Sequence, residues 1–276
     1  MANSALDLRD REGLFKELSS ENFDLLVIGG GITGAGIARD AAMRGLQVAL
    51  VEAQDFASGT SSRSTKLVHG GLRYLAQGDI NLVRESATER ATLEQLAPHL
   101  AQTQSFLLPV ASKAAQIKFR TGLWGYEKLG RVAEIDTHEV LSLKQINNLE
   151  PALDTNGWHS GITYGECITE DARLTTANIR SAYAAGAKVI NYCKVTAFDN
   201  NASGICGVRV RDTLAGGDIS SEFSISAKVI VNAAGPWVDT ISKLGNEENP
   251  AKLQLTKGVH IVVPRERLPL NKPLIA

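Results

Sequence analysis

The sequence predicts an α/β fold with a parallel sheet, and two observations lead to that prediction. First, an apolar run at 25–28 meets a glycine turn at 29–31, a helical pattern follows, and a second apolar run ends in Glu52. Second, the later chain repeats the order of strand and helix and carries a buried-type apolar run at 228–235. Strands that alternate with helices form parallel sheets, because the helical crossover lets each strand run in the same direction. We therefore expect a parallel sheet with insertions and not two consecutive domains.

Length and composition agree with a globular protein of one or two domains. The chain has 276 residues, 43% hydrophobic and 21% charged, with a formal net charge of −1. This balance argues against nucleic-acid binding, which usually needs a basic excess. No apolar run reaches transmembrane length, and the charged residues among 1–20 leave no room for the apolar part of a signal peptide. The cysteines lack C-x-x-C spacing, which favours free thiols in a reducing cytoplasm over a metal site or disulfides; they are Cys167, Cys193 and Cys206.

The residues after the first strand carry the glycine spacing of a dinucleotide-binding turn. Gly29, Gly31 and Gly34 stand in G-x-G-x-x-G register. The first glycine permits a tight turn, the second lets the backbone approach a pyrophosphate, and the third allows close packing of helix on strand. The phosphates would lie on unpaired amides at the helix N-terminus, where the helix dipole favours anions. The candidate contacts here are Ile28, Gly29, Gly31, Ile32, Thr33 and Gly34.

An acidic residue at the end of the second strand supports the same site. Glu52 follows Gly31 by 21 positions (52 minus 31), close to the spacing of the acid that binds a ribose hydroxyl. Ala53, directly after it, is a further candidate contact. A coincidental glycine-rich loop is the alternative, because a lone G-x-G-x-x-G is weak evidence. The two flanking strands, the helix stop at Gly45 and the terminal acid favour a dinucleotide site, for either NAD or FAD.

The loop that follows is dense in small hydroxyl residues, which are Ser58, Thr60, Ser61, Ser62, Ser64 and Thr65. One interpretation is a flexible loop. The other is a loop that lies against a bound cofactor and gives hydroxyl and amide donors to its phosphate and ring. The next residues, His69-Gly70-Gly71-Leu72-Arg73-Tyr74, favour the second interpretation. Paired glycines permit close backbone approach, and a histidine, an arginine and a tyrosine flank them.

Apolar periodicity and chain breakers predict the remaining elements. Residues 1–20 form a short polar helical extension. Helical spacing predicts helices at 80–100, 138–149, 170–185 and from 236 onward, with Pro98, Pro151 and Gly186 as stops. Alternating or β-branched runs predict strands at 105–110, 159–169, 188–191, 228–235 and 259–263, with 194–198 continuing the strand pattern and a hairpin of 204–212 with 222–227.

Basic and aromatic residues are interleaved between 113 and 132. The basic residues are Lys113, Lys118, Arg120, Lys128 and Arg131, against Glu127 as the only acid, and the large apolar residues are Phe119, Leu123, Trp124 and Tyr126. Such a stretch suits the surface of an anionic membrane. Three glycines weaken it as a helix, and its apolar stripe is ragged. We therefore favour ordinary packing over membrane contact.

A third segment, Val231-Asn232-Ala233-Ala234-Gly235-Pro236-Trp237, ends a strand in small residues that would pass against a cofactor. With this segment the sequence resembles the FAD-dependent glycerol-3-phosphate dehydrogenases, within the wider glycine and D-amino-acid oxidase-like flavoproteins. The matching strings are VIGGGITGAGIARDAAMRGL, LVEAQDFASGTSSRSTKLVHGGLRYL, EDARL, VNAAGPWV and KGVHIVVP. They extend from about Phe23 to Pro264, and the second and last are specific to this family.

The resemblance implies an FAD/NAD(P)-binding Rossmann-like fold of the glutathione-reductase and D-amino-acid-oxidase type. The dinucleotide-binding core would occupy about 21–110 and 160–245, and the mixed sheet of a substrate domain would begin at about 246–276. Members of the family are considerably longer. We therefore interpret the 276 residues as an N-terminal portion whose C-terminal part is missing, and expect the strand at 259–263 to lack partners.

The resemblance also implies a reaction, the oxidation of sn-glycerol 3-phosphate to dihydroxyacetone phosphate with FAD as hydride acceptor and a quinone as the final acceptor. A base must take the proton of the C2 hydroxyl, and a histidine suits that task because its pKa lies near working pH. His69 and His260 are the candidates, with a structural or cofactor-contacting role as the alternative for each. Arg73 would bind the substrate phosphate with Tyr74 as hydrogen-bond partner, unless Arg73 is a surface or ion-pair residue.

The same resemblance extends the set of cofactor contacts. The hydroxyl loop contributes Thr60, Ser61, Ser62, Lys66, Leu67, Gly70 and Gly71, and the third segment contributes Ala234 and Gly235. Val195 would contact FAD through its backbone, on the adenine side. No metal ligand is expected.

Three alternatives remain at this stage. In the first, the enzyme is an oxidase that uses oxygen in place of a quinone. In the second, the chain is a flavin-binding fragment without full catalysis. In the third, the chain is an NAD-dependent enzyme of the same fold class. The last does not account for the hydroxyl loop or for VNAAGPW. A cytoplasmic location is expected, with peripheral contact at the inner face of the cytoplasmic membrane as a variant, and a homodimer is compatible with the resemblance.

Overall fold

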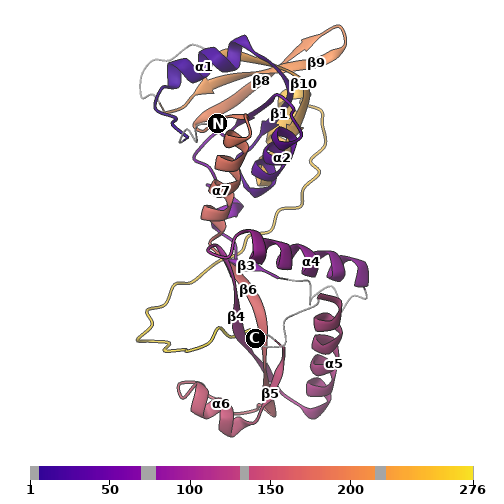
Figure 1. Cartoon of the computed structure of the whole chain (residues 1–276), viewed down its shortest axis with the longest axis vertical. Coiled ribbons are helices and arrows are strands. Elements are labelled where there is room, and N and C mark those ends of the chain that lie inside the picture. The colour runs from indigo at the N-terminus through magenta and orange to yellow at the C-terminus, as the bar shows by residue number, and fades with distance from the viewer. Residues whose placement is uncertain (1–5, 70–78, 131–136, 215–221, 276) are drawn as a thin grey trace. The chain divides into compact units, whose positions relative to one another are not determined.

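The computed structural model describes residues 6–69, 79–130, 137–214 and 222–275. The chain divides into two compact units (Figure 1). The first comprises Met1–Ser64 and Asp171–Lys257, and the second comprises Thr65–Glu170 and Gly258–Ala276. The chain thus enters the second unit after Ser64 and returns to the first at Asp171.

A six-stranded mixed sheet forms the centre of the first unit, in the order β7-β2-β1-β10-β9-β8. Its strands are β1 (Asn22–Ile28), β2 (Val48–Val51), β7 (Lys188–Ile190), β8 (Cys193–Asn201), β9 (Gly204–Asp212) and β10 (Phe223–Asn232). The first four strands in this order pair in parallel, and β10, β9 and β8 pair antiparallel. The predicted α/β fold with a parallel sheet and insertions is confirmed.

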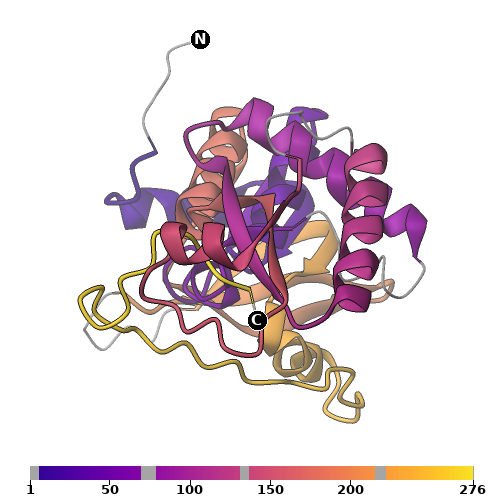
Figure 2. The same ribbon diagram turned by 90° about the horizontal axis from the view of Figure 1, so that it is seen from below.

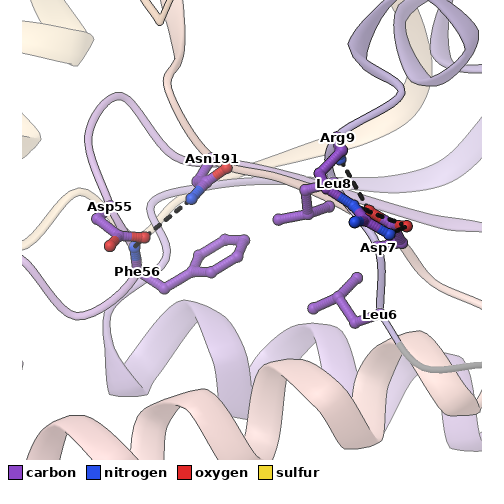
Figure 3. Close-up of a pocket in the computed structure, with 7 residues that line it drawn as sticks. All are labelled: Leu6, Asp7, Leu8, Arg9, Asp55, Phe56 and Asn191. Atoms are coloured by element: carbon purple, nitrogen blue, oxygen red, sulfur yellow. Dashed lines mark hydrogen bonds and ion pairs between the residues drawn. The ribbon is translucent and has the colours of Figure 1, made fainter.

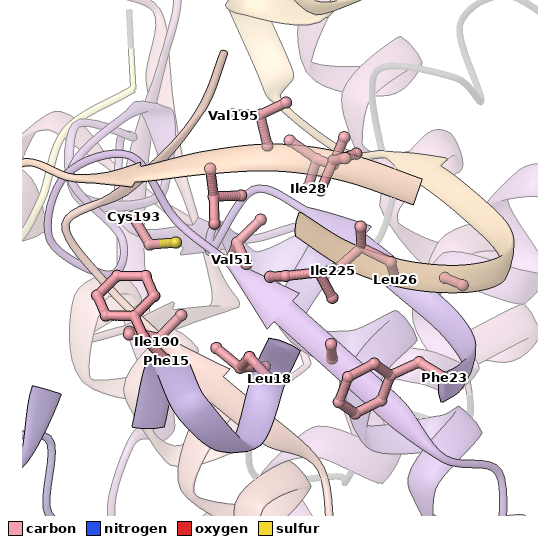
Figure 4. Close-up of a cluster of buried hydrophobic side chains, with 14 residues drawn as sticks. Phe15, Leu18, Phe23, Leu26, Ile28, Val51, Ile190, Cys193, Val195 and Ile225 are labelled. Carbon is pink, nitrogen blue, oxygen red and sulfur yellow. The ribbon is translucent and has the colours of Figure 1, made fainter. Parts of the chain in front are cut away.

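Each face of this sheet carries its own hydrophobic cluster. Alternation along β1 sends Leu26 and Ile28 to one face and Leu25 and Val27 to the other. The first face is covered by α1 (Arg11–Ser20), whose Phe15 and Leu18 enter the cluster shown in Figure 4. The second face is covered by α2 (Ile32–Met43) and α7 (Asp171–Ala184). Burial on both faces explains why β1 and β2 are continuous apolar runs in the sequence.

Local signals set the ends of the helices in the first unit. Asp10 caps α1, because its carboxylate accepts a 3.0 Å hydrogen bond from the amide of Gly13. The buried face of α2 consists of alanines and one glycine, which brings the helix close to β1. After β10 come a short 3-10 helix, η3 (Gly235–Trp237), and α8 (Val238–Gly245).

The second unit contains a sheet with strand order β3-β6-β4, with β5 paired to β6 (Figures 1 and 2). Its strands are β3 (Leu67–Val68), β4 (Ala101–Val110), β5 (Glu139–Leu141) and β6 (Ser160–Thr169). Its helices are α4 (Ile80–Leu96), α5 (Lys113–Gly130) and α6 (Leu143–Leu149). Leu123 of α5 packs in the cluster that also holds Phe106 and Ile162 from β4 and β6.

Four predictions about elements require correction. Residues 138–149 are not one helix, because β5 precedes α6 and Ser142 caps α6 with a capping box. The strand pattern of 188–198 is two strands, because the chain turns at Tyr192 and β7 and β8 lie at opposite edges of the sheet. The runs 222–227 and 228–235 form one strand, β10. No strand is assigned at 259–263, where no described strand pairs with the backbone and the side chains are exposed.

The stretch 113–132 also differs from expectation. The glycines do not prevent an 18-residue helix, α5. Gly122 and Gly125 are half-buried and lie next to the buried Leu123 and Tyr126, whose packing holds the helix despite the low helix propensity of glycine.

Candidate cofactor site

The turn between β1 and α2 accepts only glycine at two positions. Gly29 has a φ of 115°, and a Cβ there would lie 2.5 Å from the carbonyl oxygen of Ala233. A Cβ on Gly34 would lie 1.9 Å from the carbonyl oxygen of Gly29. The third glycine of the motif therefore faces the first, and the start of α2 lies against the end of β1 as the motif predicts.

The hydroxyl-rich loop reaches the N-terminus of α2. Gly31 is the N-cap residue and brings no side chain to the unpaired amides. Ser61, in the 3-10 helix η1 (Thr60–Ser62), accepts a 2.9 Å hydrogen bond from the amide of Ile32. A Cβ on Gly31 would lie 3.1 Å from that hydroxyl oxygen. Two of the predicted segments thus meet at the positive end of the α2 dipole, which favours a bound anion.

Glu52 joins the end of β2 to the glycine turn. One carboxylate oxygen accepts a 2.7 Å hydrogen bond from the amide of Gly30, and the other accepts a 2.7 Å bond from the amide of Gln54. Two amides fix the orientation of the side chain while a carboxylate can accept about four hydrogen bonds. The side chain is therefore oriented and keeps the capacity to accept further hydrogen bonds, and its contact with a ribose hydroxyl stays a prediction.

The third predicted segment lies beside the same turn. The amide of Ala233 donates a 2.8 Å hydrogen bond to the carbonyl oxygen of Ile28, which continues the pairing of β10 with β1. Ala234 follows it, and Gly235 begins η3 with a φ of 52°. A Cβ on Gly59 would lie 3.1 Å from the ring of Trp237, so the hydroxyl loop also passes this segment.

Val195 lies on β8, which forms one edge of the sheet. The residue as a whole is 3% exposed, and its side chain belongs to the cluster shown in Figure 4. The side chain is occupied by the core, and the predicted backbone contact of Val195 with the cofactor stays a prediction.

The other predicted residues belong to the second unit or lie outside the described residues. Lys66 precedes β3 and has a φ of 60°, Leu67 is in β3, and His69 follows it. His260 is exposed in an extended segment. Gly70, Gly71, Arg73 and Tyr74 lie outside the described residues. The catalytic roles of these residues stay predictions.

Three residues at this site were missed by the sequence reasoning. A Cβ on Gly30 would lie 2.7 Å from the ring of Phe56, and the third glycine of the run was the available signal. The side chain of Asn232 donates to the carbonyl oxygen of Val238 at 2.8 Å and accepts from the amide of Ala234 at 3.2 Å. Asp171 accepts a 2.8 Å bond from the hydroxyl of Ser64. The available signal for Asn232 was a polar residue at the end of an apolar run. The available signal for Asp171 was a polar residue at the start of a helix.

A shallow cavity of about 470 Å³ lies near the end of β2 in the same unit. It is lined by Leu6, Asp7, Leu8, Arg9, Asp55, Phe56 and Asn191, and Figure 3 shows the 2.8 Å hydrogen bond from the Asn191 amide group to Asp55. None of its lining residues is a predicted contact. One of them, Phe56, also lies against Gly30, so the cavity borders the turn at 29–34.

Two of the thiols in the described part of the chain are not arranged for chemistry. Cys167 and Cys193 are buried, and burial raises the pKa of each thiol to about 12. Both thiols therefore stay protonated and poorly nucleophilic near neutral pH. Among the residues that the structure describes, no group of three His, Cys, Asp or Glu side chains could hold a metal ion.

Comparison with known proteins decides the family. The family model described as FAD dependent oxidoreductase matches residues 24–276. The chain belongs to the FAD-dependent oxidoreductases. Within the curated proteins, aerobic glycerol-3-phosphate dehydrogenase of Staphylococcus haemolyticus is 45% identical over 271 residues, which is 97% of this chain and 48% of that protein. The enzyme of the same name from Staphylococcus aureus (strain USA300) is 45% identical over 272 residues and is covered to the same extent. The chain spans about half the length of these curated relatives.

Solved structures give the same result for this FAD-dependent oxidoreductase. The glycerol-3-phosphate dehydrogenase of Bacillus halodurans complexed with FAD matches with a TM-score of 0.67 and 39% identity, over 86% of this chain and 39% of that one. L-proline dehydrogenase from P. horikoshii matches with a TM-score of 0.63 at 21% identity, over 83% of this chain and 57% of that one, which shows the shared fold. The family resemblance and FAD as the cofactor, both expected from the sequence, are confirmed.

The residues of the turn fit FAD. The absence of side chains at Gly29 and Gly31 leaves open the approach to the N-terminus of α2, where amides and a dipole suit a pyrophosphate. Glu52 supplies an oriented carboxylate at the neighbouring strand end. These are the features that a dinucleotide requires from this fold.

Proposed function

We propose that this chain is the cofactor-binding part of an enzyme that oxidises sn-glycerol 3-phosphate to dihydroxyacetone phosphate and passes the electrons to a quinone. The observation that carries this proposal is the 45% identity over 97% of the chain to proteins named aerobic glycerol-3-phosphate dehydrogenase. The fit of the turn at 29–34 to a dinucleotide supports the proposal, because an enzyme with this activity needs a site for its flavin cofactor.

In this proposal the residues of the first unit hold the cofactor. The N-terminus of α2 at Ile32 and Thr33 binds the pyrophosphate together with the hydroxyl of Ser61, whose oxygen accepts from the amide of Ile32, and Glu52 binds the ribose. The backbone of Val195 contacts the adenine side. Thr60, Ser62, Ala53, Ala234 and Gly235 line the approach.

The remaining predicted residues act on the substrate. A bound FAD would supply the acceptor for the hydride from C2 of glycerol 3-phosphate. His69 or His260 takes the proton of the C2 hydroxyl, so that the C–O bond becomes a carbonyl as the C–H bond breaks. Arg73 and Tyr74 hold the substrate phosphate, because a planar guanidinium can make two parallel hydrogen bonds to it. Lys66, Leu67, Gly70 and Gly71 contact the cofactor from the same segment.

A quinone acceptor requires that the enzyme meet a membrane, and the outer face of α5 supplies a suitable surface. Ile117 and Trp124 are 60% and 58% exposed and lie seven positions apart (124 minus 117), on one line of the helix. Leu123 and Tyr126 are buried on the opposite side. The helix therefore packs through one face and presents a second, apolar face to solvent.

Charge on α5 favours an anionic lipid surface as the partner of this face. Lys113, Lys118, Arg120 and Lys128 are exposed. The only acid of the helix, Glu127, lies 2.8 Å from Nδ1 of His138 and is 11% exposed. Exposed cations that flank exposed Ile and Trp side chains are typical of interfacial helices. In the described parts of the chain, no helix is long and apolar enough to cross a membrane.

Anaerobic addition of sn-glycerol 3-phosphate to the flavin-loaded protein tests the reaction. We expect the flavin absorbance to bleach and to return when a quinone analogue is added. Persistent absorbance would contradict catalysis by this chain. Return of the absorbance with oxygen alone, with stoichiometric peroxide, would replace the quinone by oxygen. Glycerol serves as the control substrate, because it lacks the phosphate that Arg73 is proposed to bind.

A further inference from the structure

The first residue of α1, Arg11, lies at the centre of a set of hydrogen bonds that the sequence did not predict. Its Nε and Nη2 atoms contact the two carboxylate oxygens of Asp212 at 2.7 and 3.0 Å. The two side chains are only 14% and 8% exposed. A bidentate pair with so little solvent contact is directional, because guanidinium and carboxylate are both planar.

The same guanidinium holds the turn that connects β7 to β8. Nη2 of Arg11 donates to the carbonyl oxygens of Asn191 and Tyr192, at 2.9 and 3.3 Å. Tyr192 has a φ of 50°, a backbone conformation that a non-glycine residue adopts only at a cost. Arg11 therefore stabilises a turn whose conformation is not favoured locally.

The turn between β7 and β8 is also hydrogen-bonded to the end of β2, where Glu52 lies. The amide of Cys193 donates to the carbonyl oxygen of Glu52 at 2.7 Å, and the amide of Tyr192 donates to that of Gln54 at 2.8 Å. The amide group of Asn191 donates to Asp55 at 2.8 Å (Figure 3). Glu52 orients its carboxylate through the amides of Gln54 and Gly30, so the backbone that Arg11 stabilises also sets this carboxylate.

We propose that Arg11 is a positioning residue of the FAD site, which acts through the 191–193 turn on the carboxylate of Glu52. This inference rests on the proposed contact of Glu52 with the ribose. It gives α1, to which the sequence assigned no function, a part in cofactor affinity.

A purely structural role, as a tether of α1, is the competing explanation. Other contacts already hold this helix. Phe15 and Leu18 are buried in the core, Phe15 stacks on Phe223 with ring centroids 4.7 Å apart, and Glu17 binds Lys188 at 2.6 Å. Loss of Arg11 is therefore expected to leave α1 in place while the turn at 191–193 loosens.

The test is a double-mutant cycle on FAD affinity in the 276-residue protein. The dissociation constant of FAD is measured by quenching of flavin fluorescence for wild type, Arg11→Met, Glu52→Gln and the double variant. We expect Arg11→Met to weaken FAD binding about tenfold in the wild-type background and much less in the Glu52→Gln background, because coupled residues are not additive. Arg44→Met is the matched control, since Arg44 binds Asp40 at 2.8 Å with both side chains largely exposed.

Each outcome decides the proposal. An Arg11→Met variant that binds FAD as tightly as Arg44→Met overturns it, and so does the same loss of affinity in both backgrounds, which is the signature of a structural tether. If Arg11→Met does not fold, Arg11→Lys takes its place in the cycle, because lysine keeps the charge but cannot hold the carboxylate and two carbonyls together. A wild-type chain that binds no FAD overturns the proposal together with the cofactor site. Bound FAD that substrate does not bleach contradicts only the proposed reaction.

Discussion

The carboxylate of Glu52 accepts a 2.7 Å hydrogen bond from the backbone amide of Gly30. This bond joins the end of β2 to the glycine turn without any cofactor contact. Glu52 is thus part of the hydrogen bonding of the glycine turn itself. Its substitution should affect both the stability of the turn and the binding of the ligand.

We expect Glu52→Gln to weaken FAD binding about tenfold and to lower the free energy of unfolding by about 1–3 kcal/mol. A glutamine keeps one oxygen acceptor, but its NH2 group faces the second backbone amide, so two donors meet. Flavin fluorescence titration and urea unfolding measure the two effects. Glu247→Gln, on an exposed side chain, is the control. Equal FAD affinity of both variants would contradict a role for Glu52 in the site.

Gly34→Ala should prevent formation of the cofactor turn. The added methyl group would lie 1.9 Å from the backbone carbonyl oxygen of Gly29, which cannot move without displacing the end of β1. Purified Gly34→Ala should contain little or no flavin. Gly36→Ala on the same helix meets nothing within 4 Å and should bind FAD normally, with a gain in stability of up to about 1 kcal/mol from helix propensity. Normal flavin content in Gly34→Ala would disprove the close approach of helix and strand.

The buried thiol of Cys193 should make stability fall at alkaline pH. Burial raises its pKa to about 12 in the folded protein, above the unfolded value of about 8.5. The stabilisation is thus fully present below about pH 8.5 and is lost as pH rises toward 12, by up to about 1.4 kcal/mol per pH unit, because the unfolded state loses its proton first. Urea unfolding at about pH 8 and about pH 10 measures this slope, and Cys193→Ala should reduce it. An unchanged slope in Cys193→Ala would count against the thiol.

The buried pair of Arg90 and Glu166 should be sensitive to loss of one partner. Nη1 of Arg90 lies 3.3 Å from the carboxylate of Glu166 and 2.9 Å from the hydroxyl oxygen of Tyr126. Both charged side chains are at most 5% exposed. Glu166→Leu leaves a buried cation and should destabilise the second unit by about 3–5 kcal/mol, whereas Arg90→Met combined with Glu166→Leu should cost less. Chemical denaturation tests this order. Asp40→Asn, in the exposed pair with Arg44, should change stability by less than about 1 kcal/mol.

The outer face of α5 should govern binding to anionic lipid. We expect Trp124→Glu to abolish sedimentation with vesicles of anionic phospholipid. The substitution removes an apolar anchor and adds to the helix a negative charge, which the anionic lipid surface repels. The fold should remain intact, since Trp124 is 58% exposed. Leu255→Glu, on a residue 65% exposed in the first unit, is the control. Equal sedimentation of both variants, or none with wild type, would contradict the proposed contact.

Local signals sufficed for the elements around the turn. The glycine spacing, the apolar runs and the stop at Gly45 predicted β1, α2 and β2, and Glu52 was identified by its distance along the chain. Such features depend on backbone conformation and on hydrogen bonds between near neighbours in the chain, so a short stretch of sequence suffices to predict them.

Errors occurred where long-range pairing overrides local pattern. The run at 222–235 was divided in two, yet its first half pairs antiparallel with β9 and its second half parallel with β1, which makes it one strand. The segments 188–191 and 194–198 look alike in sequence and lie at opposite edges of the sheet. Strand identity in these cases depends on the neighbouring strands, which no window of sequence contains.

The sequence by itself determined the family, the dinucleotide turn and the acid beside it, because these are written as residue types at fixed spacing. Only the tertiary structure decided which distant groups support that turn. Arg11 meets Asp212 across 201 positions of chain, and Ser64 meets Asp171 across 107. Their pairing depends on the burial and direction of each side chain after the sheet has formed. Neither property can be predicted from the order of residues along the chain.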